Sequence, residues 1–127
     1  MSTRAERLAT ERNVWVATTR PDGRPHLTPI WFVFVDARVW LCTGAPAVKA
    51  RNLRANSSVS FALENGSEPV TGEGVAVVHA GLDTVPGSVL EAFRSKYDWD
   101  LTTDATYQTV IEISITKWLH PGDTVVE

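Results

Sequence analysis

The sequence contains few of the residues that build metal centres and covalent cross-links. Its 127 residues include one cysteine, Cys42, and three histidines, His26, His79 and His120. A single cysteine cannot form a disulfide within the chain, which is the usual pattern in a reducing cytosol, and we expect Cys42 to be a small buried hydrophobe. No two histidines have the spacing of a metal-binding pair, and Cys42 has no second cysteine beside it. We therefore expect no internal disulfide and no metal site.

Long apolar runs and an excess of basic residues are also missing. No apolar segment is long enough to span a bilayer, and residues 1–12 are too polar and charged for a signal peptide. The formal net charge of -3 and the isoelectric point near 5.6 differ from the basic balance of most nucleic-acid-binding domains. We expect a cytoplasmic protein that binds a small molecule, does not bind nucleic acid and does not insert into membranes.

No motif of a nucleophilic enzyme or of a phosphate-binding loop is present. The chain has no G-x-S-x-G sequence, and neither Ser57 nor Ser58 has a base that the sequence reveals. Gly72 and Gly74 lie inside a predicted strand, where they indicate a bulge or a close approach of another group rather than a nucleotide loop. We therefore assign no catalytic side chain.

The patterns that are present predict one domain, residues 1–127, that is rich in antiparallel strands. The hydrophobic content of 43% supports a modest core. Alternating runs between turn residues predict six strands, at 14–19, 24–34, 39–43, 59–64, 70–80 and 110–116, with 117–120 as an extension of the last. Helices are predicted at 2–11, 46–56 and 86–97. Hairpin connections between most strands favour an α+β, mainly β, six-stranded antiparallel barrel with two to three short helices.

The predicted strand at 24–34 has two different faces and contains two prolines. Proline cannot donate to a strand ladder, so Pro25 and Pro29 indicate an edge, a bulge or a place where a ligand meets the backbone. Alternation along the strand separates Pro25, Leu27, Pro29, Trp31 and Val33 from His26, Thr28, Ile30, Phe32 and Phe34.

The predicted helix at 46–56 carries a basic segment. Helical geometry puts Lys49, Asn52 and Leu53 on one face, with the leucine towards the core, while Arg51 and Arg54 share another face. A phosphate near the start of this helix would meet free backbone N–H groups and Lys49 together, with Arg51 as a second donor or as a contact for a ligand tail or a partner subunit. The alternative is a solvated basic helix face. On the first interpretation, this helix and the strand at 24–34 hold a flavin-like cofactor between them.

Five tryptophans are many for a chain of this length. Trp15 and Trp40 lie in short predicted strands, and we expect both in the core. Trp31, in the proline-containing strand, and Trp99, in a polar connection, are candidates for contact with a flat ring. His26 is either a hydrogen-bonding ligand contact or an exposed strand histidine.

Three stretches together resemble the pyridoxamine 5′-phosphate oxidase-like split β-barrel superfamily. They are Arg20-Pro21-Asp22-Gly23-Arg24-Pro25-His26, Thr28-Pro29-Ile30-Trp31 and Lys49-x-Arg51-Asn52-Leu53. The stretch Lys96-Tyr97-Asp98-Trp99 and the closing strand through Trp118 extend the resemblance over nearly the whole chain. Within the superfamily, the chain looks most like the branch of flavin- and deazaflavin (F420)-dependent oxidoreductases common in actinobacteria. Its alanine-, valine- and arginine-rich composition agrees with such a source.

The resemblance implies an FMN-binding split barrel of Greek-key type, assembled as a homodimer with two cofactor sites at the subunit interface. The ring and ribityl chain of the cofactor would be lined by His26, Thr28, Pro29, Ile30 and Trp31. The phosphate would be held by Thr43, Lys49, Arg51 and Asn52, and Trp99 would close the ring pocket across the interface. Some relatives have Arg or Ser at the position of Ala47, so this chain lacks one phosphate contact. Pyridoxamine oxidases are usually longer and carry additional basic residues near the C-terminus, so pyridoxamine oxidation itself is not expected.

The function that the resemblance implies is that of an F420-dependent reductase, which transfers a hydride from reduced deazaflavin to a small unsaturated or quinone-like acceptor. Protonation would come from solvent, in agreement with the lack of a catalytic constellation. Two alternatives stay open. One is an FMN-dependent oxidoreductase on the same fold, and the other is a non-catalytic protein that binds or carries a flavin, F420 or haem.

Overall fold

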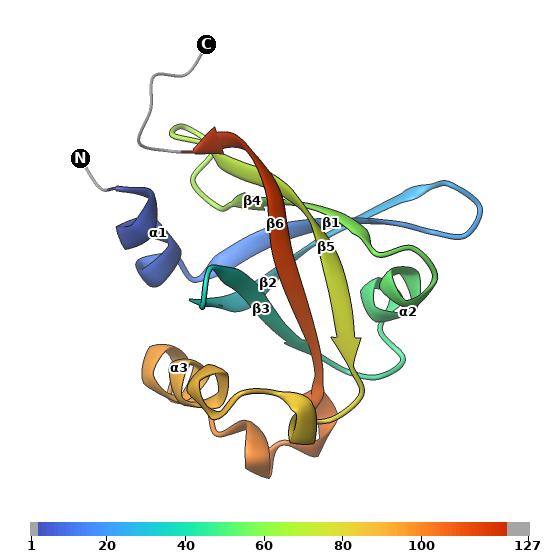
Figure 1. Cartoon of the computed structure of the whole chain (residues 1–127), viewed down its shortest axis with the longest axis vertical. Coiled ribbons are helices and arrows are strands. Elements are labelled where there is room, and N and C mark those ends of the chain that lie inside the picture. The colour runs from blue at the N-terminus through green and yellow to red at the C-terminus, as the bar shows by residue number, and fades with distance from the viewer. Residues whose placement is uncertain (1–2, 122–127) are drawn as a thin grey trace.

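Six antiparallel strands in the described part of the chain close into a barrel, in the order β1-β2-β3-β6-β5-β4 (Figure 1). The structure is a computed structural model, and it describes residues 3–121. Hairpins join most consecutive strands, as the turn residues of the sequence require. The strands are β1 (Asn13–Thr19), β2 (Pro25–Val35), β3 (Arg38–Thr43), β4 (Ser58–Leu63), β5 (Val70–His79) and β6 (Thr109–Pro121).

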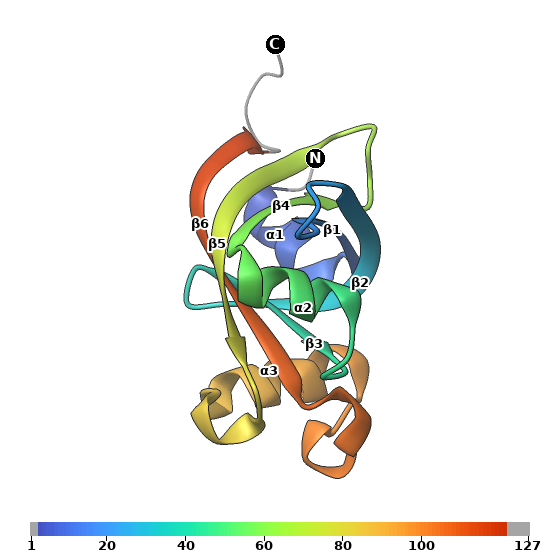
Figure 2. The same cartoon turned by 90° about the vertical axis from the view of Figure 1, so that its right-hand side faces the viewer.

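Between residues 3 and 121, three α-helices lie around the barrel. They are α1 (Arg4–Thr10), α2 (Val48–Ala55) and α3 (Gly87–Tyr97). Helix α2 packs against β1 and β5, and α3 packs mainly against β2 (Figure 2). Three short 3-10 turns flank α3 in the chain: η1 (Leu82–Thr84), η2 (Leu101–Thr103) and η3 (Ala105–Tyr107). Among residues 3–121, no helix has both the length and the apolar character needed to cross a membrane.

This architecture confirms the fold class that the sequence predicts. All six expected strands and all three expected helices are present, and β6 continues through residues 117–120. Thr3 caps α1, because its Oγ1 accepts a hydrogen bond of 3.2 Å from the backbone N–H of Glu6. Ser2, the first residue of the predicted helix, lies outside the described residues.

The apolar side chains form two clusters. One fills the barrel and includes Phe32 and Ile111, both fully buried. The other lies between α3 and the outer face of the sheet, where Phe93 packs near Trp40 and Cys42. Trp40 and Cys42 are 2% and 3% exposed, so the prediction that they are core residues is confirmed.

Trp15 is not a core residue, and the prediction that placed it there is wrong. Its neighbours Val14 and Val16 are fully buried inside the barrel, while the indole of Trp15 is 40% exposed. Because side chains alternate along a strand, burying both valines sends Trp15 to the outer face.

The two glycines of β5 lie where strands approach closely. The pairing of β5 with β6 shifts register between Thr71 and Gly72 and again between Glu73 and Gly74, which confirms the predicted irregularity. A Cβ on Gly72 would lie 2.6 Å from Cζ of Phe61, and a Cβ on Gly74 would overlap the carbonyl oxygen of Ser114. Glycine is therefore required at both positions for steric reasons.

Half of β2 has a neighbouring strand on one side only. Residues 25–31 pair with β1, whereas pairing with β3 is confined to Phe32–Val35. Pro25 and Pro29 both lie in the half without a second neighbour, as expected for prolines at an open edge. This open edge splits the barrel wall and positions the candidate site.

Candidate functional site

A cavity of about 550 Å³ opens beside the unpaired half of β2. Its volume falls within the range of ~300–1,000 Å³ that is typical of small-molecule sites. The walls come from the start of β1, from β2, from the end of β3, from the start of α2 and from the segment 99–107, which contains η2 and η3. In Figure 2, the end of β3 lies between α2 above it and the orange segment of residues 101–107 below it. The lining residues are Asn13, Pro29, Ile30, Trp31, Cys42, Thr43, Lys49, Trp99, Asp104 and Tyr107.

Aromatic rings make one wall of the cavity. The indole of Trp31 stacks on Tyr97 with a centroid distance of 4.5 Å and an interplanar angle of 8°. Trp99 meets Trp31 at 5.8 Å and 80°, and meets Tyr107 at 5.6 Å and 75°. The Nε1 of Trp99 donates a hydrogen bond of 3.1 Å to Oδ2 of Asp104, which fixes the indole in the wall. Trp31 and Tyr107 remain 40% and 44% exposed, so both offer ring surface to a ligand.

The phenol of Tyr97 anchors this wall to the backbone of β2. Its hydroxyl accepts a hydrogen bond of 3.0 Å from the N–H of Phe32 and has two carbonyl acceptors within reach, on Arg12 at 2.7 Å and on Phe32 at 2.8 Å. Burial raises the pKa of Tyr97 to about 12, so the hydroxyl keeps its proton at neutral pH. The stack of Trp31 on Tyr97 therefore rests on a fixed ring.

Lys49 brings a positive charge into the cavity from the first turn of α2. Burial lowers the pKa of its ammonium group, and no acidic side chain within residues 3–121 forms an ion pair with it. Ala47 provides no side-chain cap for α2, so the first N–H groups of the helix lack the usual partner. The lysine and the helix start together suit an anion.

His26 and Thr28 lie on the same face of β2 as Ile30, a residue that lines the cavity. The Nδ1 of His26 and the Oγ1 of Thr28 are buried and have no hydrogen-bond partner within the described residues. A buried polar atom without a partner costs about 1–3 kcal/mol. Burial, together with the positive charges of Arg20 and Lys49, lowers the pKa of His26, so its imidazole is neutral at pH 7. These two orphaned atoms fit a polar ligand.

Arg51 and Asn52 lie at a different cavity, of about 310 Å³, between α2 and the β1–β2 hairpin. Asn52 is buried, and its Nδ2 donates a hydrogen bond of 3.0 Å to Oγ1 of Thr18. Arg51 is exposed. Arg20 and Arg24 also line this cavity, and Arg24 pairs with Asp22 at 2.8 Å.

The structure therefore divides the predicted site residues among three places. Two of them, His26 and Thr28, lie on β2 without lining either cavity, and Arg51 and Asn52 line the smaller cavity. The larger cavity is lined by Pro29, Ile30, Trp31, Thr43, Lys49 and Trp99.

Four residues that line the larger cavity were not among the predicted site residues: Asn13, Cys42, Asp104 and Tyr107. Asp104 and Tyr107 belong to the same polar and aromatic connection as Trp99. Their position near Trp99 in the sequence is the signal that could have identified them. Gly44, after β3, explains why that connection reaches the site, since a Cβ there would lie 3.3 Å from the carbonyl oxygen of Thr106. No group of three or more metal-ligating side chains lies within residues 3–121.

Residues 3–120 match the model of the family described as pyridoxamine 5′-phosphate oxidase. The chain belongs to this family. The resemblance identified from the sequence is thereby confirmed. No curated protein sequence matches the chain.

Solved structures show the same pyridoxamine 5′-phosphate oxidase-like fold at low identity. An F420 reductase is 19% identical with a TM-score of 0.71, and the match covers 89% of this chain and 93% of that one. The haem storage protein HutZ from Vibrio cholerae is 19% identical with a TM-score of 0.74, covering 89% and 87%. A conserved hypothetical protein from Mycobacterium tuberculosis is 25% identical with a TM-score of 0.69, covering 100% and 91%. Proteins with this fold are thus named for different ligands.

Proposed function

We propose that this protein is an F420-dependent oxidoreductase that reduces a small unsaturated or quinone-like acceptor. The observation that carries the proposal is the pairing, in one cavity, of a half-buried lysine without an acidic partner and a wall of aromatic rings. A cofactor with a flat ring and a phosphate matches both features. When bound, it supplies hydride transfer, and the protein supplies binding and orientation.

Different side chains hold different parts of such a cofactor. Lys49, with Thr43 and the first turn of α2, binds the phosphate. Pro29, Ile30 and Trp31 lie along the open edge of β2 and support the ring. His26 and Thr28 line neither cavity, so their orphaned atoms would pair with the polar chain between ring and phosphate only where the bound cofactor extends beyond the cavity lining along β2.

No side chain in the cavity acts as a dedicated acid. Tyr107 lines the cavity at a site that is 44% exposed, so water reaches the acceptor from that side. Solvent therefore supplies the proton that an unsaturated acceptor needs after it takes up the hydride. The cavity residues hold the reacting groups in place and cover the ring.

The smaller cavity favours F420 over FMN. F420 continues beyond its phosphate into an acidic tail, which FMN lacks. Arg20, Arg24 and Arg51 surround a cavity on the other side of the start of α2, and Arg51 has no ion-pair partner among residues 3–121. Guanidinium groups bind carboxylates well, so Arg51 binds the acidic tail of the cofactor while Lys49 binds its phosphate.

The second candidate is a non-catalytic carrier of a flavin, F420 or haem. HutZ is named as a haem storage protein, but in this chain no histidine lines the cavity. Cys42 does line it, and burial raises the pKa of that thiol to about 12, which disfavours a thiolate ligand for haem iron. A flavin or deazaflavin cofactor therefore suits the cavity better than haem does.

The proposal includes a homodimer with cofactor sites at its interface. A groove on the outer face of β1, β2, β4, β5 and β6 is lined mainly by apolar residues, and Leu27, Leu119 and Trp15 are 60%, 42% and 40% exposed there. Covering this groove with a second copy of the chain would remove these side chains from water.

One titration tests the proposed function. Purified protein is titrated with F420 and, separately, with FMN, and the fluorescence of Trp31 and Trp99 reports binding. We expect saturable quenching by F420 and weaker binding of FMN. Tight FMN binding without a response to F420 would assign the FMN-dependent function, and binding without turnover of enones or quinones would assign the carrier function.

A further inference from the structure

One part of the cavity wall combines three aromatic rings with a carboxylate. Trp31, Trp99 and Tyr107 lie in different planes, with interplanar angles of 80° and 75° between neighbours. Asp104 accepts the hydrogen bond of the Trp99 indole and lines the same cavity. The other charged residue in the lining is Lys49, which comes from α2 and serves the phosphate in the proposed function.

The charge of Asp104 is not neutralised by a neighbouring cation. Its Oδ2 accepts the indole N–H of Trp99, and no lysine, arginine or histidine within residues 3–121 forms an ion pair with it. Its side chain is partly buried, so water screens the charge incompletely. A ligand with a positive charge would be attracted to this position.

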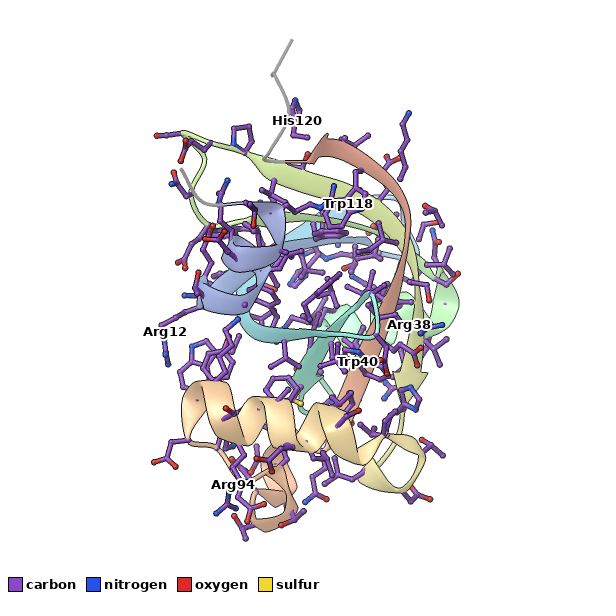
Figure 3. All side chains as sticks on the ribbon, turned by 60° about the vertical axis from the view of Figure 1, so that its left-hand side comes forward. Arg12, Arg38, Trp40, Arg94, Trp118 and His120 are labelled. Atoms are coloured by element: carbon purple, nitrogen blue, oxygen red, sulfur yellow. The ribbon has the colours of Figure 1, made fainter. Side chains whose placement is uncertain are left out.

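The aromatic rings favour the same kind of ligand. The face of an aromatic ring is electron-rich and attracts cations, and several rings around one site form a cage for organic ammonium groups. A guanidinium of the protein already contacts these rings: the Arg12 Cζ is 5.3 Å from the Trp31 centroid and 4.8 Å from the Tyr97 centroid, so it lies beside the stack. Figure 3 shows Arg12 beside α3, near the start of β1.

We propose that the acceptor reduced at this site is a planar cation of the iminium or pyridinium class, held by the rings of Trp99 and Tyr107 and the carboxylate of Asp104, next to the Trp31 ring that supports the cofactor. This inference rests on the proposed function and names its substrate class. Such an acceptor would take up, at the carbon of its C=N bond, the hydride that a bound reduced cofactor supplies, and the π electron pair would move to nitrogen as a lone pair. The two electrons lost by the cofactor would thus cancel the positive charge of the acceptor, and no proton would be required.

The chemistry agrees with the residues present. Binding of a C=N⁺ acceptor needs groups that attract a cation, and its reduction by a hydride needs no general acid. The cavity lining offers a carboxylate and ring faces, and it offers no histidine. After transfer, an acceptor of the pyridinium class becomes a neutral dihydropyridine, so it binds less tightly to Asp104 and the rings and is released.

Calorimetric titration with two probes of the same shape tests the inference. N-methylquinolinium carries the charge, and 1-methylnaphthalene is its neutral counterpart. We expect the wild-type protein to bind the cation at least about tenfold more tightly, in line with cation–π and ion-pair contributions in a partly desolvated site. Asp104→Asn keeps an acceptor for Trp99 and removes the charge, so it is expected to reduce the preference about tenfold. Asp83→Asn, at an exposed acid of η1, is the matched control and is expected to leave the preference unchanged.

Equal affinities for the two probes in the wild-type protein would overturn the inference, as would a preference that survives in folded Asp104→Asn protein. The titrations are run with and without saturating F420. If F420 binds but the cation preference is absent, the substrate class is wrong and the proposed function stands. If the preference is present but neither F420 nor FMN binds, the cation site stands and the oxidoreductase function falls.

Discussion

Lys49 and Lys96 are both half-buried lysines, and their surroundings give them different roles. Burial lowers the pKa of each. Lys96 donates hydrogen bonds to the carbonyl oxygens of Phe32, at 3.0 Å, and of Leu8, at 3.5 Å. Lys49 has no such partner in the described residues and faces the larger cavity. Lys96 forms its hydrogen bonds within the protein and therefore stabilises the fold. Lys49 forms none within residues 3–121, so its ammonium group is available to a ligand.

Replacing Lys49 with alanine is expected to weaken cofactor binding by about 10- to 100-fold, because a charge-assisted hydrogen bond to phosphate contributes about 1.5–3 kcal/mol. Fluorescence titration with F420 and FMN measures the loss. Lys117→Ala removes an exposed lysine of β6 and serves as the control, with an expected change of less than twofold. Unchanged affinity for both cofactors in Lys49→Ala would remove this residue from the phosphate site.

Replacing Lys96 with methionine is expected to have an effect that depends on pH. Burial, reinforced by the charge of Arg12, lowers the pKa of Lys96 in the folded protein to about 8, against 10.5 when unfolded. The charged amine therefore opposes folding most strongly below pH 8, and this cost fades as pH rises from about 8 to 10.5.

The wild-type protein should accordingly gain stability relative to Lys96→Met between pH 7 and pH 10. We expect a gain on the order of 1 kcal/mol, discounted because the amine is only half buried. Urea denaturation at the two pH values measures it. Lys117→Met is the control, for which no such gain is expected. An equal difference in unfolding free energy at both pH values would show that the pKa of Lys96 is not depressed.

At the scale of elements, β5 depends on its glycines. An alanine at position 74 would place its Cβ against the Ser114 carbonyl oxygen of β6 and 2.9 Å from Cγ2 of Ile113. Because that carbonyl belongs to the strand ladder, it cannot move without loss of pairing. We expect Gly74→Ala to lower the unfolding free energy by about 2–3 kcal/mol in urea denaturation. Gly66→Ala, in a turn with no atom within 4 Å of the added Cβ, should change it by less than about 0.5 kcal/mol, and equal effects would contradict the steric argument.

The sequence predicts these elements well because their signals are local. Alternation along β1 and β2 and the turn at Gly23 (φ +89°) depend on neighbouring residues only. Trp15 was misplaced because alternation alone does not say which face of β1 turns inward. The inward face depends on pairing with β2 and β4, which bring Val14 and Val16 inside the barrel.

The site was less predictable than the elements because it is assembled from distant segments. Trp31 and Lys49 were identified from strand and helix patterns that also fit the family. Asp104 and Tyr107 were not, because only the docking of residues 101–107 against the end of β3 brings them to the cavity. Arg51 and Lys49 are two residues apart, so helix geometry directs them to different cavities.

At the scale of the whole molecule, the barrel formed within residues 3–121 leaves an apolar groove uncovered. Trp15 and Leu27 border it from β1 and β2, and Leu119 borders it from β6. If two copies of the chain cover this groove, the mass in solution is twice 14.0 kDa, about 28 kDa. Light scattering coupled to size-exclusion chromatography is expected to give that value.

Replacing Leu27 with glutamate should convert the dimer to a monomer, because a carboxylate without a partner is costly to bury in an apolar contact. Val77→Glu changes an equally apolar side chain of β5 that is 52% exposed and does not line the groove, so this control should stay dimeric. A wild-type mass of 14.0 kDa, or a dimer that persists in Leu27→Glu, would contradict this interface.

Titration of monomeric Leu27→Glu with F420 then shows whether a second subunit completes the cofactor site. Reduced affinity with an intact fold means that it does, since Leu27 itself does not line the cavity.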